Sequence, residues 1–560
     1  MMSVAVVFLA TYCLPTGAAA GTNIYVTTNG PGPSPFGTWA TATSNIQWAV
    51  NVGINGDTVW ISNGVYVLTN QITVTSNITI SGLSTNNRPV VDGTNGSRCF
   101  EFTSAATGTL ANLFITRGYA DKGGGLYMYS GTVRDCIFSN NFASTVDWIY
   151  GGGGAYITGN TNLIQSCTFI NNMASNNAGG LFVYDSDIIL IQSCSFVNNT
   201  AMTDGDGGGL YLRSPLRTTI AGCTFYTNIA GDSGGGFAHY GSSDILITNC
   251  NFICNVSSNI DSSTGGGGGN FAGSGTNNLI THCTFDGNAS LAGDGGGMFM
   301  SGSGWVCSDS FFSNNIATNS GGGIRLRYGA IVKNCVIARN TSQVLSGNVG
   351  GGGILMSDDG TLVQDCTIKE NTALGNFAGG VYVSGGTLRN CLIRNNTVVG
   401  ISAATGRGGG IRVSSASAKI QSCTIVSNYA DWGGGGIYNP VVMQFDNCII
   451  YFNKSGSVPT SSNLYDSSSS SYSNCCVAGF VDATAVITNN ITTANPQFVD
   501  WTNSNYHLDR NSPCINAGVN RDWMANAVDF DGYRRVDKFS GRVDIGCYEY
   551  LPSGVIFSVR

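Results

Sequence analysis

Charged residues are scarce in this chain of 560 residues. Asp, Glu, Lys and Arg together make up 10% of it, against about 25% in ordinary globular domains. The net charge is −7 and no basic stripe supplies phosphate contacts, so the sequence predicts no nucleic-acid partner. After residue 20 no apolar run approaches the roughly 20 residues of a membrane span, so we expect no membrane span there.

Glycine, in contrast, is abundant, with 79 residues, and it marks a repeat. Between Gly123 and Asn453 a glycine-rich turn, an alternating apolar segment and the pattern Cys-x-(Phe/Ile)-x-x-Asn recur twelve times. One serine interrupts the cysteine column, which reads Cys136, Cys167, Cys194, Cys223, Cys250, Cys283, Ser310, Cys335, Cys366, Cys391, Cys423 and Cys448. An asparagine follows five residues after each of these positions, from Asn141 to Asn453. Columns that persist while loops change length are typical of a solenoid.

The segments after each glycine turn predict strands. Residues alternate in Leu126-Tyr127-Met128-Tyr129, and the Cys-x-(Phe/Ile) segments alternate in the same way. Each repeat of about 28 residues therefore carries at least two short strands, and no helical pattern interrupts them. One repeat per turn of a parallel β-helix predicts an all-β fold of about 12 regular coils, with further coils on the N-terminal side.

In such a fold, equivalent residues of successive coils lie directly over one another. Inward Cys, Phe and Ile then form apolar ladders, and the asparagines bond to each other at a bend; a ligand role for the asparagines is the less favoured alternative. In-register stacking holds Cβ atoms about 4.8 Å apart, whereas a disulfide prefers about 3.8 Å. The cysteine column therefore predicts buried free thiols, and the absence of accompanying histidines disfavours a metal site there.

The two ends of the chain differ from the repeat. Residues 1–20 are typical of a secretory signal peptide, with an apolar segment from Val4 to Ala10 and a cleavage site near Ala20, although a mis-assigned start codon is the alternative. An amphipathic helix is expected over residues 45–52, with Ser44 as a candidate N-cap. We predict a β-helix over residues 21–460, and a Ser-rich stretch then leads into a separate C-terminal capping module, residues 461–560.

This C-terminal segment carries a family resemblance. The stretches Asn495–Asp500, Asn511–Gly518, Asp529–Arg535 and Val543–Tyr550 occur in the order of the C-terminal signature of bacterial choice-of-anchor Q proteins. The N-terminal stretch through Trp60 is similar to that family too, and the repeats resemble those of chlamydial polymorphic outer membrane proteins.

The resemblance implies a right-handed β-helix of the pectin-lyase fold, in a secreted or surface-displayed bacterial protein. No anchor is visible in the ten residues after the signature. Cys514 and Cys547 stand where family members carry small residues, which implies a disulfide between them.

Many pectin-lyase-fold proteins cleave polysaccharides, yet the familiar motifs of pectate lyases and polygalacturonases are absent here. Asp204, Asp206 and Asp232 fall on adjacent coils near Arg213, which is the nearest approach to a calcium-plus-base catalytic site. Ordinary turn chemistry of Asp beside Gly is the favoured explanation of these residues. We expect no cofactor, and Ca²⁺ is the one ion left open.

The outward face of the strand after each glycine turn is the other candidate site. We expect its aromatic and arginine residues to be exposed, where they could stack sugar rings and bind carboxylate or sulfate groups. The candidate ligand-binding residues are Tyr127, Tyr129, Tyr156, Phe182, Tyr184, Tyr211, Arg213, Arg325 and Arg327, joined by Trp148 and Tyr150 from a long loop. The alternative is that these rings stack on one another or lie under loops.

Three functions remain open from the sequence. The favoured one is a non-catalytic surface, adhesion or polysaccharide-binding scaffold, with a polysaccharide or cell-surface glycan as partner. The first alternative is a polysaccharide lyase or glycoside hydrolase with a divergent site. The second is a purely structural rod.

Overall fold

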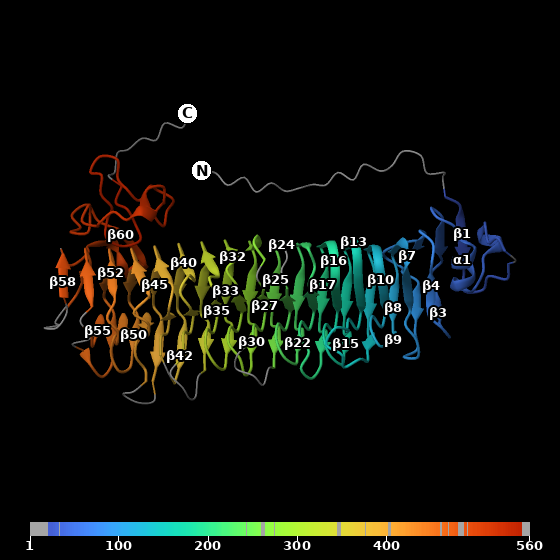
Figure 1. Ribbon diagram of the computed structural model, residues 1–560, viewed down its shortest axis with the longest axis horizontal. Helices are drawn as coiled ribbons and strands as arrows, with labels where there is room; N and C mark the ends of the chain where they lie inside the picture. The colour runs from blue at the N-terminus through green and yellow to red at the C-terminus, as the bar shows by residue number, and fades with distance from the viewer. Residues whose placement is uncertain are drawn as a thin grey trace.

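The chain forms one long parallel β-helix (Figure 1). The computed structural model describes residues 21–32, 34–241, 244–258, 264–273, 275–343, 349–375, 377–400, 405–459, 462–468, 470–479, 486–489 and 491–551. A short helix, α1 (Ile46–Val52), packs at the N-terminal end, and the last segment of the chain folds back beside the rod at the other end. The expected signal peptide, residues 1–20, lies outside the described residues and stays a prediction.

Most coils of the repeat contain four strands, two more than the minimum expected, and in the others the first two form one long strand such as β10 (Leu126–Arg134). In one coil these are β19 (Leu210–Arg213), β20 (Arg217–Ala221), β21 (Thr224–Tyr226) and β22 (Ile229–Ala230). We call them the first, second, third and fourth strand of a coil. Each pairs in parallel with its equivalents in the neighbouring coils, as β19 does with β16 (Leu181–Gln192) and β23 (Phe237–Tyr240).

The number of coils follows from the third strands, because these form a sheet of 16 strands, one from each coil. Twelve of these strands belong to the repeat, three precede it and one follows it. In order they are β3 (Val65–Val67), β6 (Val90–Asp92), β8 (Phe114–Thr116), β11 (Ile137–Ser139), β14 (Thr168–Ile170), β17 (Ser195–Val197), β21, β25 (Asn251–Ile253), β29 (Thr284–Asp286), β33 (Phe311–Ser313), β37 (Val336–Ala338), β41 (Thr367–Lys369), β45 (Leu392–Arg394), β49 (Thr424–Val426), β53 (Ile449–Tyr451) and β57 (Cys476–Val477). The predicted all-β fold is confirmed, with one further coil beyond the repeat.

The asparagine column forms a continuous hydrogen-bonded ladder at the bend between the third and fourth strands. Asn228 is typical: its Nδ2 donates to Asn255 Oδ1 at 2.9 Å and to the Phe196 carbonyl at 2.9 Å. Its Oδ1 accepts from the backbone and side-chain nitrogens of Asn199 at 3.0 and 2.9 Å. Both donors and both acceptor positions of this buried amide are therefore used, which meets the requirement on buried polar groups. The predicted structural role of the column is confirmed.

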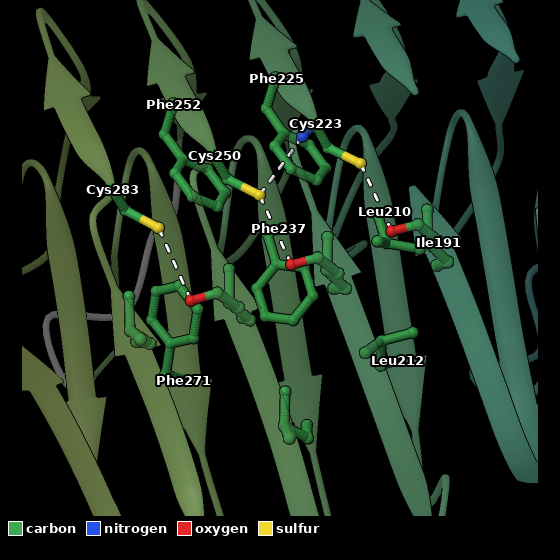
Figure 2. Close-up of a cluster of buried hydrophobic side chains, with 14 of the residues drawn as sticks. Ile191, Leu210, Leu212, Cys223, Phe225, Phe237, Cys250, Phe252, Phe271 and Cys283 are labelled. Carbon is green, nitrogen blue, oxygen red and sulfur yellow. Dashed lines mark hydrogen bonds between the residues drawn. The ribbon is translucent and has the colours of Figure 1, made fainter. Parts of the chain in front are cut away.

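Apolar ladders fill the interior beside the asparagines (Figure 2). The rings of Phe225 and Phe252 stack with centroids 4.7 Å apart and planes 1° apart, and the phenylalanine stack runs from Phe138 to Phe312. The Cys250 sulfur lies 3.3 Å from the Thr248 carbonyl oxygen and accepts from the Cys223 backbone N–H at 3.4 Å. All described cysteines are free thiols, and Cys254 is the exposed one among them.

Glycine is required at the turn that precedes the first strand. Gly207 has a φ of 64°, and a Cβ there would lie 2.5 Å from the Leu210 carbonyl oxygen. At Gly209 a Cβ would lie 2.6 Å from the Gly236 oxygen and 3.1 Å from Cγ of Asn228. The glycine column thus lets the backbone of each coil press against the asparagine ladder.

The N-terminal end agrees with expectation except in its cap. The N-cap of α1 is Asn45, whose Oδ1 accepts from the Trp48 N–H at 3.1 Å, and the expectation of Ser44 was wrong by one residue. Ile46, Ala49 and Val50 are the buried face of this helix. The first strand of the rod is β1 (Asn23–Val26), which pairs with β2 (Thr58–Ile61).

The predicted domain boundary at residue 460 is wrong. The rod continues through β55 (Leu464–Asp466), β56 (Ser471–Ser473), β57 and β58 (Val486–Asn489). The Ser-rich stretch is therefore part of a coil, because Tyr472 stacks on Phe445 at 4.8 Å and Cys475 extends the thiol ladder beyond Cys448. The pattern fades there because Val477 stands in the Phe/Ile column and Phe480 stands in place of the asparagine.

The C-terminal segment, from residue 491 onward, docks on the outer face of the third strands of the last coils. Leu392, Val426 and Ile449 pack against it from the rod. Asparagines at the bends before the third strands hold its backbone: Asn447 exchanges two hydrogen bonds with Val519, both at 2.8 Å. Arg535 is fully buried between Glu549, at 3.3 Å, and Asn390, at 3.4 Å. The C-terminal segment, which we expected to cap the end of the rod, thus covers its side.

The disulfide implied by the family resemblance is absent. Cys514 and Cys547 are both buried free thiols, and Cys514 instead lies against Cys476 of the last coil. Burial raises the pKa of the Cys547 thiol to about 12, as it does for Cys99. No helix among the described residues is both long and apolar enough to cross a membrane.

Replacing one rung of the asparagine ladder should destabilise the rod. Asn228→Ala removes four hydrogen bonds and leaves buried partners unsatisfied, so we expect urea unfolding to show a loss of about 3 to 5 kcal/mol. Asn277→Ala, at an exposed position, should change stability by no more than about 0.5 kcal/mol. Equal effects of the two variants would contradict the ladder's role.

Thiol accessibility tests the cysteine ladder independently. Residues 21–560 contain 18 cysteines, and Cys254 is the exposed one. Because burial shields the others from the reagent, Ellman's reagent should label one thiol in the native protein and all 18 in denaturant without reductant. A count well below 18 in denaturant would show disulfides and contradict the free-thiol ladder.

Candidate functional site

The outward residues of the first strands form columns, as expected, but much of their surface is covered. Tyr156, Phe182 and Tyr211 lie in register on β13 (Ala155–Gln165), β16 and β19, and only 2%, 0% and 1% of their surface is exposed. The expectation of an exposed aromatic face is therefore wrong at these three positions. The physical reason is in-register stacking: the rings of Phe182 and Tyr211 lie 4.9 Å apart and 10° from parallel.

The remaining aromatic candidates border this buried cluster. Tyr127, Tyr150 and Tyr184 are half-buried against it, and Tyr129 is half-buried one strand position further on. Lys122 lies over the rings of Tyr127 and Tyr150, with its Nζ 4.9 and 4.4 Å from their centroids.

Among the aromatic candidates, Trp148 is the one that stays open to solvent, with 56% of its surface exposed. It stands in the loop of residues 144–150, and the Arg213 guanidinium carbon lies 3.8 Å from its ring centroid. Arg213 also donates from Nη1 to the Tyr211 hydroxyl at 3.1 Å. The structure thus brings Trp148 together with Arg213 and Tyr211, which lie on a different coil.

Asn177 holds the Trp148 loop in place. Its Nδ2 donates to the Trp148 carbonyl oxygen at 2.6 Å, and its Oδ1 accepts from the Asp206 backbone N–H at 2.8 Å. Asn177 is 3% exposed, so this bridge is sheltered from water. Sequence reasoning missed Asn177, because neither a column nor a motif distinguishes it from other loop asparagines.

Asp206 and Asp232 approach each other beneath this loop. Asp206 Oδ1 accepts from the Ser233 backbone N–H at 3.1 Å, while Asp232 Oδ1 accepts from the Ser233 hydroxyl at 3.3 Å. Burial, reinforced by the Asp232 charge and opposed by Arg213, raises the pKa of Asp206 to about 8. Asp204, in contrast, is exposed. Of the four residues considered for a catalytic site, Asp206, Asp232 and Arg213 thus lie near one another, and Asp204 lies at the surface.

Two tyrosines complete the polar group. Burial raises the pKa of both Tyr211 and Tyr240, and the Asp206 charge adds to the shift in each. The Tyr240 hydroxyl accepts from Asn270 Nδ2 at 2.9 Å. The group can therefore hold one proton on a carboxyl beside a second carboxylate and a guanidinium, which are donors and acceptors suited to sugar hydroxyls.

Arg325 and Arg327 belong to a different arrangement further along the same face. Arg325 lies 3.4 Å from Asp294, and Arg327 lies 3.7 Å from Asp358. Both guanidinium groups are thus neutralised by carboxylates of the rod. In the described part of the chain, no three His, Cys, Asp or Glu residues gather closely enough to hold a metal ion.

Residues 130–306 and 305–439 match a family model for the right-handed beta helix region. The chain belongs to the right-handed β-helix family. This confirms the β-helix fold that the repeat predicted and the right-handedness that the family resemblance implied. The proposed membership in the choice-of-anchor Q group remains a resemblance of the terminal segments.

Several solved β-helix structures are similar to this β-helix protein at low identity. Pectate lyase Pel9A is 13% identical, with 95% of this chain and 97% of that chain covered and a TM-score of 0.21. Alginate lyase AlyF-OU02 in complex with G6 is 14% identical over 73% and 86% of the two chains, with a TM-score of 0.31. Pectin methylesterase PemA from Erwinia chrysanthemi is 13% identical over 68% and 81%, with a TM-score of 0.20.

No curated protein matches the chain. At TM-scores below 0.5, the solved structures give no information on the chemistry of this β-helix protein. That chemistry has to be inferred from its own residues.

The raised pKa of Asp206 predicts a pH-dependent stability. The unfolded chain loses this proton near pH 4, whereas the folded protein keeps it to about pH 8, so the free energy of unfolding falls as the pH rises between these values. Asp206→Asn keeps an acceptor for the Ser233 N–H and removes the ionisation. At about 1.4 kcal/mol per pH unit, the variant should gain about 4 kcal/mol over wild type between pH 5 and pH 8 in urea unfolding.

Asp204→Asn is the matched control, because Asp204 is exposed on the same turn. A constant difference between Asp206→Asn and wild type at every pH would show that Asp206 ionises normally.

Proposed function

We propose that this β-helix protein is a non-catalytic polysaccharide-binding scaffold, with Trp148 at the centre of its binding site. The observation that carries the proposal is an exposed indole fixed on a guanidinium beside two carboxyl groups. An exposed indole beside a guanidinium and carboxyl groups is suited to a sugar, because the ring face can pack on apolar C–H groups while the polar groups bond to hydroxyls.

The geometry fits a sugar ring better than an apolar ligand. Arg213 covers one face of the Trp148 indole, and the other face is available to the C–H groups of a pyranose. The Arg213 guanidinium and the Asp206 and Asp232 carboxyl groups supply both donors and acceptors for sugar hydroxyls. Asn177 fixes the loop, so little ordering is needed when a ligand binds.

Polysaccharide cleavage is a second candidate function, and the Asp206–Asp232 pair favours it. A carboxyl group that keeps its proton near neutral pH beside a second carboxyl group is an arrangement that general acid–base catalysis uses. Asp206 is largely buried, so it reaches only a substrate that enters below Trp148. For this reason binding without cleavage is the primary proposal.

Trp148→Ala should abolish most of the binding. Purified residues 21–560 are first screened on a glycan array with and without Ca²⁺, and any hit is measured by titration calorimetry. Loss of one stacked ring should weaken the affinity about tenfold or more. Trp48→Ala is the matched control, because Trp48 is 59% exposed on α1, far from the loop, and should bind as wild type does.

The products of each hit distinguish the candidates. Intact glycan after incubation supports the binding scaffold. Cleaved glycan, lost in Asp206→Asn while binding persists, would replace the scaffold by an enzyme. Absence of any hit, or equal affinity of Trp148→Ala and wild type, would contradict the proposed site and favour a structural rod.

A further inference from the structure

A second group of aromatic and basic residues lies on the same face, near the C-terminal end of the rod. Phe377, Tyr382 and Tyr438 are 4%, 5% and 9% exposed and form a satellite cluster with Leu355. Tyr382 and Tyr438 lie on the first strands β43 (Val381–Ser384) and β51 (Ile437–Asn439), on either side of β47 (Ile411–Val413). This cluster belongs to coils far from Trp148.

Arg407 and Arg412 are embedded in this cluster. The Arg412 guanidinium carbon lies 3.6 Å from the Phe377 ring centroid and 5.0 Å from that of Tyr438. The Arg407 guanidinium carbon also lies 5.0 Å from the Tyr438 centroid, and its Nη1 donates to the Tyr438 hydroxyl at 2.9 Å. Two cations therefore share one aromatic ring.

No carboxylate in the described part of the chain lies within ion-pair distance of either arginine. The contrast with Arg325 and Arg327 is direct, because Asp294 and Asp358 neutralise those two on the same face. Within the described residues, the rod thus places carboxylates beside Arg325 and Arg327 but none beside Arg407 and Arg412.

The nitrogen atoms of these arginines are also short of hydrogen-bond acceptors. Nε and Nη1 of Arg412 and Nε of Arg407 are buried without a partner among the described residues. Burying a guanidinium edge without an acceptor destabilises a protein, since water is lost and nothing replaces it. The outermost nitrogen of each group remains able to donate to a ligand.

We propose that Arg407 and Arg412 form a binding site for the carboxylate or sulfate groups of an acidic polysaccharide. Guanidinium groups bind such oxyanions through charge-assisted hydrogen bonds, and the aromatic walls hold both side chains in fixed positions. The rings are too buried to stack on a sugar or a base, so recognition here falls on the charged group. The site is separate from Trp148 and does not depend on binding there.

Arg412→Met tests the assignment, because methionine keeps an apolar stem against Phe377 and removes the charge. Titration calorimetry of residues 21–560 uses a sulfated oligosaccharide, a polyuronate oligosaccharide and a neutral oligosaccharide of equal length. At least one acidic probe should bind, more weakly at high salt, and Arg412→Met should lower its affinity about tenfold or more. Arg217→Met, at an exposed arginine of β20, should change it less than twofold.

Thermal unfolding separates binding from packing. Without ligand, the melting temperature of Arg412→Met should equal or exceed that of wild type, since a buried group without acceptors is removed. The acidic oligosaccharide should raise the melting temperature of wild type and of Trp148→Ala, but not that of Arg412→Met. Inorganic sulfate at equal ionic strength should raise it less.

Three results would overturn the proposal. One is an acidic probe that Arg412→Met binds as tightly as wild type does, and another is the failure of both acidic probes to bind. The third is a clear fall in the melting temperature of ligand-free Arg412→Met, which would assign Arg412 to packing. If inorganic sulfate raised the melting temperature as much as the acidic oligosaccharide does, the site would bind a free oxyanion, and its assignment to a polysaccharide would be wrong.

Discussion

In-register stacking of parallel coils is the constraint on which the rest of this structure depends, and the asparagine ladder enforces it. Each buried amide donates to the next asparagine and to a carbonyl of the preceding coil, as Asn228 does with Asn255 and Phe196. A slip of one residue would leave every amide in the column unsatisfied at once. The ladder therefore fixes the register that the Phe and Cys columns require, and glycine at Gly209 lets the backbone lie directly against it.

The same stacking orders the outer surface of the rod, where it determines which side chains a ligand can reach. Like residues at equivalent outward positions stack on each other, so Phe182 and Tyr211 become a second, smaller core. Side chains that can bind a ligand are exposed where a loop interrupts the column, as the loop with Trp148 does over Arg213. They are also found where the column places a guanidinium group with no carboxylate beside it among the described residues, as at Arg412.

The C-terminal segment shows how a repeat ends without losing its order. The rod keeps stacking through Tyr472 and Cys475, and the segment beyond it covers the outer face of the third strands. Asparagines at three bends of the last coils, Asn390, Asn447 and Asn474, bond to the backbone of the docked chain. Arg535 and Glu549, which belong to the signature stretches of that segment, form the buried ion pair at this junction.

The sequence by itself determined the coil, the strand periodicity, the free-thiol column and the structural role of the asparagines. It did so because a stacked repeat makes each residue's neighbours its own equivalents, so a column in the sequence is a contact in space. It also grouped Asp206, Asp232 and Arg213 correctly, for the same reason. Only the tertiary structure decided which outward rings are buried, that Asn45 caps α1, and that Cys514 lies against Cys476 rather than Cys547. It also decided that Trp148 lands on Arg213. Loops and the docked segment have no column, so their positions depend on contacts between residues that the repeat does not relate.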